Sequence, residues 1–231
     1  MIEKAARSSA VIKVDYDRNA ANYDSVRFGT PGGRYVDKRE RAFVASVING
    51  SRVLEIGTAT GRFAVSLTNR GVEYAGIDLS QKMLRVTFKR TSRRVSLVQM
   101  DASRMAFRSY FDYVLCVRTF HFLPNPQDSL RGMFTALKPL GECLVTFETD
   151  NFFRRFLLFS QLGVSQQYYY KISDVKQMFE KAGLKPIRSG SVMKIPVTVY
   201  RKCPKQLLWA LELAERFWPW SMHDYVLGKR A

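Results

Sequence analysis

The segment that most constrains the fold of this chain runs from Arg52 to Phe63, with the sequence RVLEIGTATGRF. A short apolar run ends at Gly57, and Gly61 precedes an amphipathic stretch. This pattern predicts a buried parallel strand that turns tightly into a helix. Because the first N–H groups of a helix lack partners and lie at its positive end, such a turn suits a polar or anionic ligand. Glu55 is unusual there, since a carboxylate repels phosphate and attracts an ammonium or sulfonium group.

The glycine spacing separates two classes of nucleotide-like ligand. The dinucleotide fingerprint needs Gly-x-Gly-x-x-Gly, and its positions here hold Gly57, Ala59 and Arg62, so two of the three glycines are missing. The pattern Glu55-x-Gly57-x-Ala59-x-Gly61 instead resembles the first motif of the class I S-adenosylmethionine-dependent methyltransferases. Ala59 stands where that family has its middle glycine, so its backbone must avoid positive φ or accept a modest strain.

Two further apolar segments also end in an acidic residue. Residues 73–78 predict a strand ending at Asp78, after which Ser80 is expected to cap a helix over residues 81–90. A third strand, residues 95–100, leads into Asp101. An acid about 20 residues beyond the turn can accept hydrogen bonds from ribose hydroxyls. The resemblance makes Asp101 the acceptor for the adenine amine. Either acid alone is compatible with an ordinary polar loop, but acids after three successive strands indicate one ligand-binding edge.

The match to the family continues through a fourth strand, residues 111–117, and its exit loop to a fifth strand that ends at Glu148. The resemblance, nearest to the quinone and small-molecule group, implies a doubly wound α/β fold. Its seven-stranded, mostly parallel sheet has the order 3-2-1-4-5-7-6, strand 7 is antiparallel, and helices cover both faces. Residues 184–191 and 192–200 are expected to be strands six and seven. Before them, a helix is expected from its cap Ser173 to Gly183.

We expect one domain, residues 1–231. It divides into an N-terminal helical cap (1–50), a cofactor-binding core (51–149), a substrate-side insertion (150–172) and a C-terminal helix, hairpin and tail (173–231).

The N-terminal flank places Tyr16, Ala20 and Tyr23 on one helical face. The pattern resembles a helix that lies over the cofactor in small-molecule methyltransferases, although a surface helix with packed tyrosines fits the spacing as well. Residues 29–33 (GTPGG) read as a flexible joint, suited to a lid hinge or an ordinary turn.

Aromatic segments follow the fifth strand, at residues 151–159 and 166–170. They are compatible with an acceptor pocket, a membrane interface or the buried face of a lid helix. The amphipathic tail, residues 206–218, is expected to pack on the sheet or on a second subunit.

The resemblance assigns cofactor binding to residues of the strand-exit loops and the N-terminal helix: Tyr23, Glu55, Gly57, Thr58, Ala59, Gly61, Asp78, Leu79, Asp101, Ala102, Val117 and Arg118. His121, just beyond the fourth strand, is the candidate general base, needed only if the acceptor must lose a proton. A structural role for His121 is the favoured alternative, and His223 is a weaker candidate. No metal site is expected.

Composition narrows the class of protein. The 231 residues are 46% hydrophobic, as in a folded domain with a substantial core. No apolar run reaches the ~18–20 residues that span a bilayer, and the start lacks the apolar stretch of a signal peptide. The three cysteines have no close pair and indicate neither a disulfide framework nor a zinc site. We expect a cytoplasmic protein, either monomer or homodimer.

The chain is strongly basic, with 37 basic and 20 acidic side chains and a formal charge of +17. This charge permits attraction to nucleic acid, an anionic membrane or an acidic substrate without choosing among them. The densest cluster, between residues 82 and 94, is most simply a solvated face, expected toward the end of its helix opposite the cofactor. A second basic group is Arg201, Lys202 and Lys205.

The resemblance therefore predicts S-adenosylmethionine-dependent methyl transfer to a small-molecule acceptor by direct in-line displacement. An RNA methyltransferase that uses the basic surface is the first alternative, although no nucleic-acid-binding module is visible. An inactive, cofactor-binding regulatory protein is the second.

Overall fold

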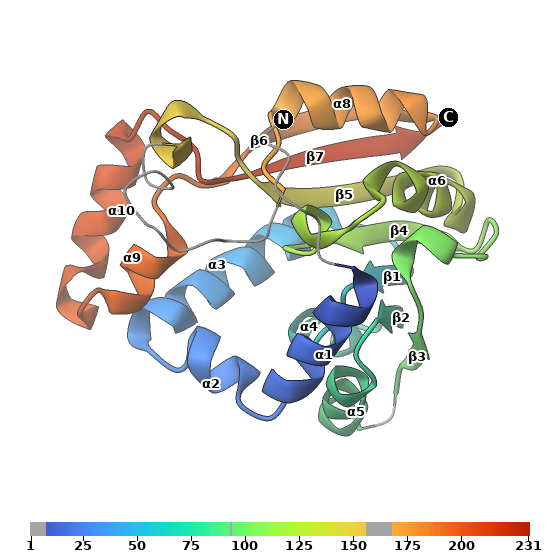
Figure 1. Ribbon diagram of the computed structural model, residues 1–231, viewed down its shortest axis with the longest axis horizontal. Helices are drawn as coiled ribbons and strands as arrows, with labels where there is room; N and C mark the ends of the chain where they lie inside the picture. Colours follow the sequence, from blue (N-terminus) through green and yellow to red (C-terminus); the bar gives the residue numbers. More distant parts are fainter. Residues whose placement is uncertain (1–7, 93, 156–167) are drawn as a thin grey trace.

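The computed structural model describes residues 8–92, 94–155 and 168–231. Its centre is a seven-stranded sheet of order β3-β2-β1-β4-β5-β7-β6, which Figure 1 shows from bottom to top. The strands are β1 (Arg52–Ile56), β2 (Glu73–Asp78), β3 (Ser96–Gln99), β4 (Phe111–Cys116), β5 (Leu137–Glu148), β6 (Leu184–Met193) and β7 (His223–Arg230). Strands β1 to β5 pair in parallel, and β7 is antiparallel to both of its neighbours. The predicted strand order is confirmed.

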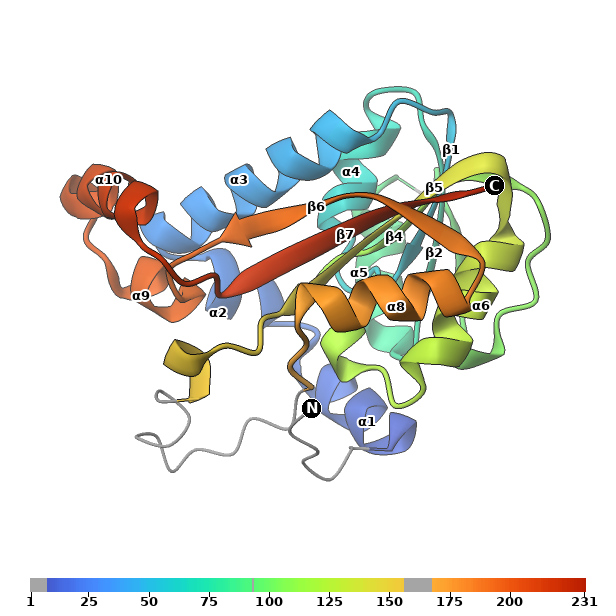
Figure 2. The same ribbon diagram turned by 90° about the horizontal axis from the view of Figure 1, so that it is seen from above.

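Helices cover both faces of this sheet, as Figure 2 shows. One face packs against α3 and α4 through Val44, Phe63 and Leu67, and the opposite face packs against α6 and α8 through Met133 and Phe179. The described helices are α1 (Ser9–Asn19), α2 (Tyr23–Phe28), α3 (Pro31–Val47), α4 (Arg62–Thr68), α5 (Gln81–Arg90), α6 (Pro126–Ala136), α8 (Ile172–Lys181), α9 (Val197–Lys202) and α10 (Leu208–Phe217).

Several local predictions are confirmed. Ser80 caps α5, accepting a 3.1 Å hydrogen bond from the N–H of Met83. Gly183 follows α8 with a φ of +87°, as a helix stop requires. Cys116 and Cys143 are buried and unpaired in the core. Helix α8 begins two residues earlier than predicted, because Lys171 rather than Ser173 is its N-cap.

The predicted position of the seventh strand is wrong. Residues 197–202 form α9 instead, and the strand between β5 and β6 comes from the tail, His223–Arg230. Short apolar runs suit a buried helix as well as a strand. Tyr200, fully buried against Val36 and Met193, fixes the helical choice, because tertiary packing outweighs the strand preference of β-branched residues.

The joint predicted at residues 29–33 is reduced to a bend at Gly29 and Thr30. Helix α3 begins at Pro31, and Thr30 caps it by accepting a hydrogen bond from the N–H of Gly33. A Cβ on Gly32 would stand 1.7 Å from the carbonyl oxygen of Tyr200. These glycines therefore serve close backbone packing of α3 rather than motion.

The tail packs on helices rather than on the sheet face. Leu208, Leu211 and Trp218 contact a cluster made by α3, α9 and the end of β6. Trp209 and Phe217 point outward, 65% and 81% exposed. Among the described residues, no helix combines the length and apolar character needed to cross a membrane.

Candidate functional site

A cavity lies at the carboxyl ends of β1, β2 and β4, beneath α1 and α2. It encloses about 970 Å³ of space, part of which is open solvent. All but one of the cofactor-binding residues predicted from the sequence line it: Tyr23, Glu55, Gly57, Thr58, Ala59, Asp78, Leu79, Asp101, Ala102, Val117 and Arg118. The exception is Gly61, which does not line the cavity but begins α4 behind the turn.

The glycine turn has three positive φ angles at alternate positions: +73° at Gly57, +47° at Ala59 and +74° at Gly61. Ala59 thus accepts the strain that the sequence left open as one option. Hydrogen bonds hold it there: its N–H donates to Asp78 at 2.9 Å, and its carbonyl accepts from Thr87 at 2.7 Å. The turn keeps the conformation that glycine would adopt, despite the Cβ.

Glu55 is buried at the floor of the cavity, 2% exposed. Its carboxyl accepts hydrogen bonds from the hydroxyls of Tyr74 and Thr58. Burial raises the pKa of Glu55 to about 8, although these hydrogen bonds and the charge of Arg62 act in the opposite direction. Glu55 is therefore mostly protonated at neutral pH until a cation approaches it.

The two loop acids are held by hydrogen bonds from nearby groups. Asp78 accepts from the backbone N–H of Ser80 at 2.8 Å and of Ala59 at 2.9 Å, while burial raises its pKa. Asp101 accepts from Ser103 and from the hydroxyl of Ser9 at 2.7 Å. Burial opposes ionisation of Asp101, yet these hydrogen bonds lower its pKa. Both carboxylates have further lone pairs for hydroxyl or amine donors of a ligand.

The N-terminal helices are tied to this edge by polar contacts that hydrophobic periodicity did not reveal. Besides Ser9, Asp17 accepts from Ser80 at 2.6 Å, and Asp24 accepts from Thr60 at 2.7 Å. The predicted single helix is in fact two, α1 and α2, but the rings of Tyr16 and Tyr23 still meet, with centroids 6.0 Å apart.

Several lining residues were not assigned to the site from the sequence, among them Tyr16, which was placed only on the helical face that it shares with Tyr23. They come mainly from the N-terminal helices and from the exit loop of β4: Ser9, Ile12, Lys13, Tyr16, Arg27, Phe28, Thr60, Arg62, Met100, Thr119, Phe122, Leu123 and Pro124. The Tyr-x-x-x-Ala-x-x-Tyr spacing was the signal for Tyr16. Arg27 and Arg62 belong to no sequence motif from which their place in the site could be predicted.

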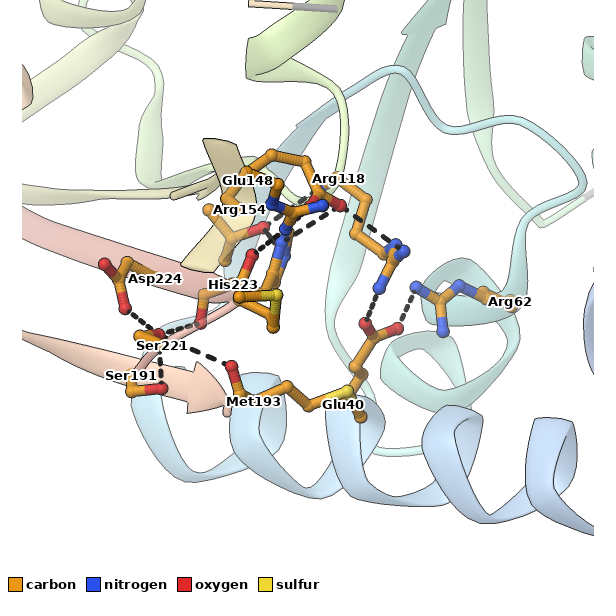
Figure 3. Close-up of polar contacts among 12 residues, drawn as sticks. Glu40, Arg62, Arg118, Glu148, Arg154, Ser191, Met193, Ser221, His223 and Asp224 are labelled. Atoms are coloured by element: carbon orange, nitrogen blue, oxygen red, sulfur yellow. Dashed lines mark hydrogen bonds and ion pairs between the residues drawn. The ribbon is translucent and has the colours of Figure 1, made fainter. Parts of the chain in front are cut away.

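A buried network of ion pairs holds the wall of the cavity, as Figure 3 shows. Glu40 of α3 accepts from Arg118 at 2.7 Å and from Arg62 at 2.5 Å. Although burial opposes it, the two arginines lower the pKa of Glu40 to about 2. Glu148 at the end of β5 pairs with Arg154 and lies 3.7 Å from His223. Arg62 and Arg118 are thereby fixed at the cavity surface.

His121 does not line this cavity, although its neighbour Phe122 does. It is 3% exposed, its ring lies 4.3 Å from that of Phe122, and its Nδ1 has no hydrogen-bond partner within the described part of the chain. Burial lowers the pKa of His121 to about 3. A ring so poor at accepting a proton fits a structural role better than general-base catalysis. His223, at the start of β7, is buried against Thr146.

The segment after β5 is only partly described. Tyr169 and Tyr170 are buried outside the cavity, and the N–H of Tyr168 donates to the carbonyl of His121 at 2.9 Å. The remainder of the predicted lid, residues 156–167, lies outside the described residues. Within the described ranges, no cluster of side chains suits a metal ion.

The basic helix α5 lies closer to the site than expected. Lys82, Arg85 and Lys89 are exposed, but Arg90 donates to the carbonyl of Thr60 at 3.0 Å and pairs with Asp24. Arg93 lies outside the described residues.

Comparison with known proteins agrees with this geometry. Residues 54–145 match the family model described as a methyltransferase domain. This segment is a methyltransferase domain of the S-adenosylmethionine-dependent class. A ubiquinone biosynthesis O-methyltransferase of Azoarcus sp. (strain BH72) is 26% identical over 64% of this chain and 70% of its own length. The ubiquinone biosynthesis O-methyltransferase of Chromobacterium violaceum is 29% identical over 59% of this chain and 66% of its own length.

Solved structures share the fold of this methyltransferase. The magnesium protoporphyrin IX methyltransferase of Synechocystis, with bound S-adenosylhomocysteine, superposes with a TM-score of 0.72 at 12% identity, covering 97% of this chain and all of that one. A possible histamine N-methyltransferase of Thermotoga maritima has a TM-score of 0.71 at 20% identity, covering 95% and 100%. S-adenosylmethionine is the methyl donor of the family.

The residues present suit that donor. Asp78 offers acceptors for ribose hydroxyls, Asp101 offers them for an amine, and apolar Leu79, Met100 and Ala102 can flank a planar base. Glu55 is a buried carboxyl whose charge becomes favourable next to an ammonium group.

Proposed function

We propose that this methyltransferase transfers a methyl group to a small molecule. The observation that carries the proposal is the single cavity that joins the strand-end acids Glu55, Asp78 and Asp101 to a wall of aromatic rings. That wall consists of Tyr16, Tyr23 and Phe122; the centroids of Tyr16 and Phe122 are 6.1 Å apart. An aromatic wall beside the donor favours a small, planar or apolar acceptor.

In the proposed site, the donor's ribose lies against Asp78, its adenine against Asp101 and Ala102, and its methionine end against Glu55 and the turn at Gly57. Tyr23, Val117 and Arg118 then border the methyl group. The donor supplies a methyl group already activated by a sulfonium, so the chain's own work is alignment and exclusion of water. Helices α1 and α2 close over the cavity, and hydrogen bonds from Ser9 and Thr60 hold them there.

The names of several relatives support a small acceptor. Ubiquinone biosynthesis O-methyltransferases, a magnesium protoporphyrin IX methyltransferase and phosphoethanolamine N-methyltransferase 2 from Haemonchus contortus are all similar to this chain. RNA is the second candidate acceptor because of the +17 charge and the exposed basic side chains of α5. An inactive binding protein is disfavoured, since the acids and the strained turn are all retained.

The donor assignment is tested by calorimetry of S-adenosylmethionine binding to the full chain. Asp78→Asn keeps the shape but loses a charged acceptor, so we expect affinity to fall about 10- to 100-fold. Asp128→Asn, in an exposed pair with Arg131, is the matched control and should bind as the wild type does. Undetectable binding by the wild type would refute the assignment, and unchanged affinity in Asp78→Asn would show that the ribose lies elsewhere.

The acceptor class is tested with a labelled methyl donor offered small-molecule extract or total RNA. Label in the small-molecule fraction is the expected result. Label in RNA, with activity that falls steeply as salt rises, would favour the second candidate.

A further inference from the structure

Three arginines from distant parts of the sequence lie close enough to interact electrostatically, at or beside the cavity. Arg27 belongs to α2, Arg118 to the exit loop of β4, and Arg201 to α9. Arg27 and Arg118 line the cavity itself.

The start of α3 holds these segments together. A Cβ on Gly32 would stand 3.2 Å from the backbone nitrogen of Arg201, and a Cβ on Gly33 would stand 2.7 Å from the carbonyl oxygen of Arg27. Both glycines therefore permit α2 and α9 to approach α3 at backbone contact distance. The Gly-Gly pair that resembled a hinge in the sequence brings the backbones of Arg27 and Arg201 against the same turn of α3.

The carboxylates of this region are already engaged. Glu40 is shared by Arg62 and Arg118, and Asp37 by Arg41 and Arg62. Glu148 pairs with Arg154 and lies 3.9 Å from Arg118.

Arg27 and Arg201 have no carboxylate partner within the described ranges. Arg27 lies over the ring of Tyr23, 4.8 Å from its centroid, and both arginines are partly buried. Burial lowers the pKa of Arg201, and the positive charges of Arg27 and Arg118 lower it further. Like charges gathered in a partly desolvated place repel one another, and an anion bound between them removes that repulsion.

We propose that Arg27 and Arg201 bind a carboxylate or phosphate group of the methyl acceptor, with Arg118 adding its charge from behind. The acceptor is then a small anionic molecule whose ring or apolar body lies against Tyr16, Tyr23 and Phe122. Arginine suits this role because its planar, permanently charged fork bonds both oxygens of such a group. This inference rests on the proposed function and specifies its substrate class.

The test uses three ring compounds that differ in charge, each titrated into the full chain by calorimetry. The probes are 4-hydroxybenzoate, phenyl phosphate and neutral phenol, with and without saturating S-adenosylhomocysteine. We expect the anions to bind and phenol to bind at least about tenfold more weakly. The tighter of the two anions identifies the acceptor group as carboxylate or phosphate. Phenol binding as tightly as both anions would overturn the proposal, and this comparison needs no variant.

Variants then locate the anion. Arg201→Met and Arg27→Met should each weaken anion binding about 10- to 100-fold, and Arg201→Lys should restore part of the loss. Lys202→Met, the exposed neighbour of Arg201 on the same helix, is the matched control and should change nothing. Full anion affinity in both methionine variants would overturn the proposal. Affinity for S-adenosylmethionine, measured in parallel, separates this failure from that of the proposed function, because Arg201 does not line the proposed donor site.

Discussion

Replacing Glu55 with Gln tests the electrostatics at the floor of the cavity. Glu55 has an ordinary pKa of 4.5, which burial raises to about 8 in the folded chain. Between these values the unfolded chain has lost the proton and the folded chain has kept it. The contribution of Glu55 to folding stability therefore falls as pH rises through this window and is constant above about pH 8.

The size of this effect follows from the two pKa values. Each pKa unit corresponds to about 1.4 kcal/mol, so Glu55 alone removes about 2.5 kcal/mol of stability between about pH 5 and about pH 7. A glutamine has a similar shape and can bond the hydroxyls of Tyr74 and Thr58, but it does not titrate.

The assay is urea unfolding of the wild type and Glu55→Gln at both pH values. The contributions of all other titrating groups to the pH dependence of stability cancel in the difference between the two proteins. We expect the variant to gain about 2.5 kcal/mol on the wild type between about pH 5 and about pH 7. A difference that is the same at both pH values would refute the reasoning, because it would mean that Glu55 is ionised throughout.

Cofactor binding provides a second measurement of the ionisation state of Glu55. In the proposed site, an ammonium group next to Glu55 stabilises its ionised form, so binding at neutral pH should release about one proton. Calorimetry in two buffers with different ionisation heats measures this number. Binding without proton release would place the ammonium away from Glu55.

Two further substitutions test the turn and the buried ion pairs. Gly57→Ala introduces strain at positive φ and a Cβ 2.2 Å from the hydroxyl of Thr119, whereas Gly71→Ala introduces similar strain with no atom within 4 Å. In urea unfolding, Gly57→Ala should therefore lower the free energy of unfolding by at least about 1 kcal/mol more than Gly71→Ala does. Equal losses would mean that the turn has room for a side chain. Glu40→Gln leaves two buried arginines without their shared carboxylate and should lower the free energy of unfolding by about 3–5 kcal/mol in the same assay. A loss of stability no larger than that of the exposed control Asp128→Asn would show that the network of ion pairs contributes little to stability.

The cofactor edge was predictable because its signals are local. Each acid directly follows its own strand, and parallel pairing of β1, β2 and β3 brings the strand ends together without further information. The conformation of the turn was predicted in part: the two outer glycines indicated positive φ, whereas the positive φ of Ala59 was left open until the structure gave it.

What depended on tertiary structure is the acceptor side and the far edge of the sheet. Glu40 and Arg118 are 78 residues apart in the sequence. Hydrophobic periodicity does not predict an ion pair between a helix side chain and a loop side chain. The seventh strand comes from the tail because strand pairing is non-local. The predicted segment, residues 192–200, is the more apolar of the two, yet residues 223–230 pair with β5 and β6. The sequence alone predicted where a methyl donor binds, because its signals are local. The packing of α2, α3 and α9 brings together the arginines that we propose meet the acceptor.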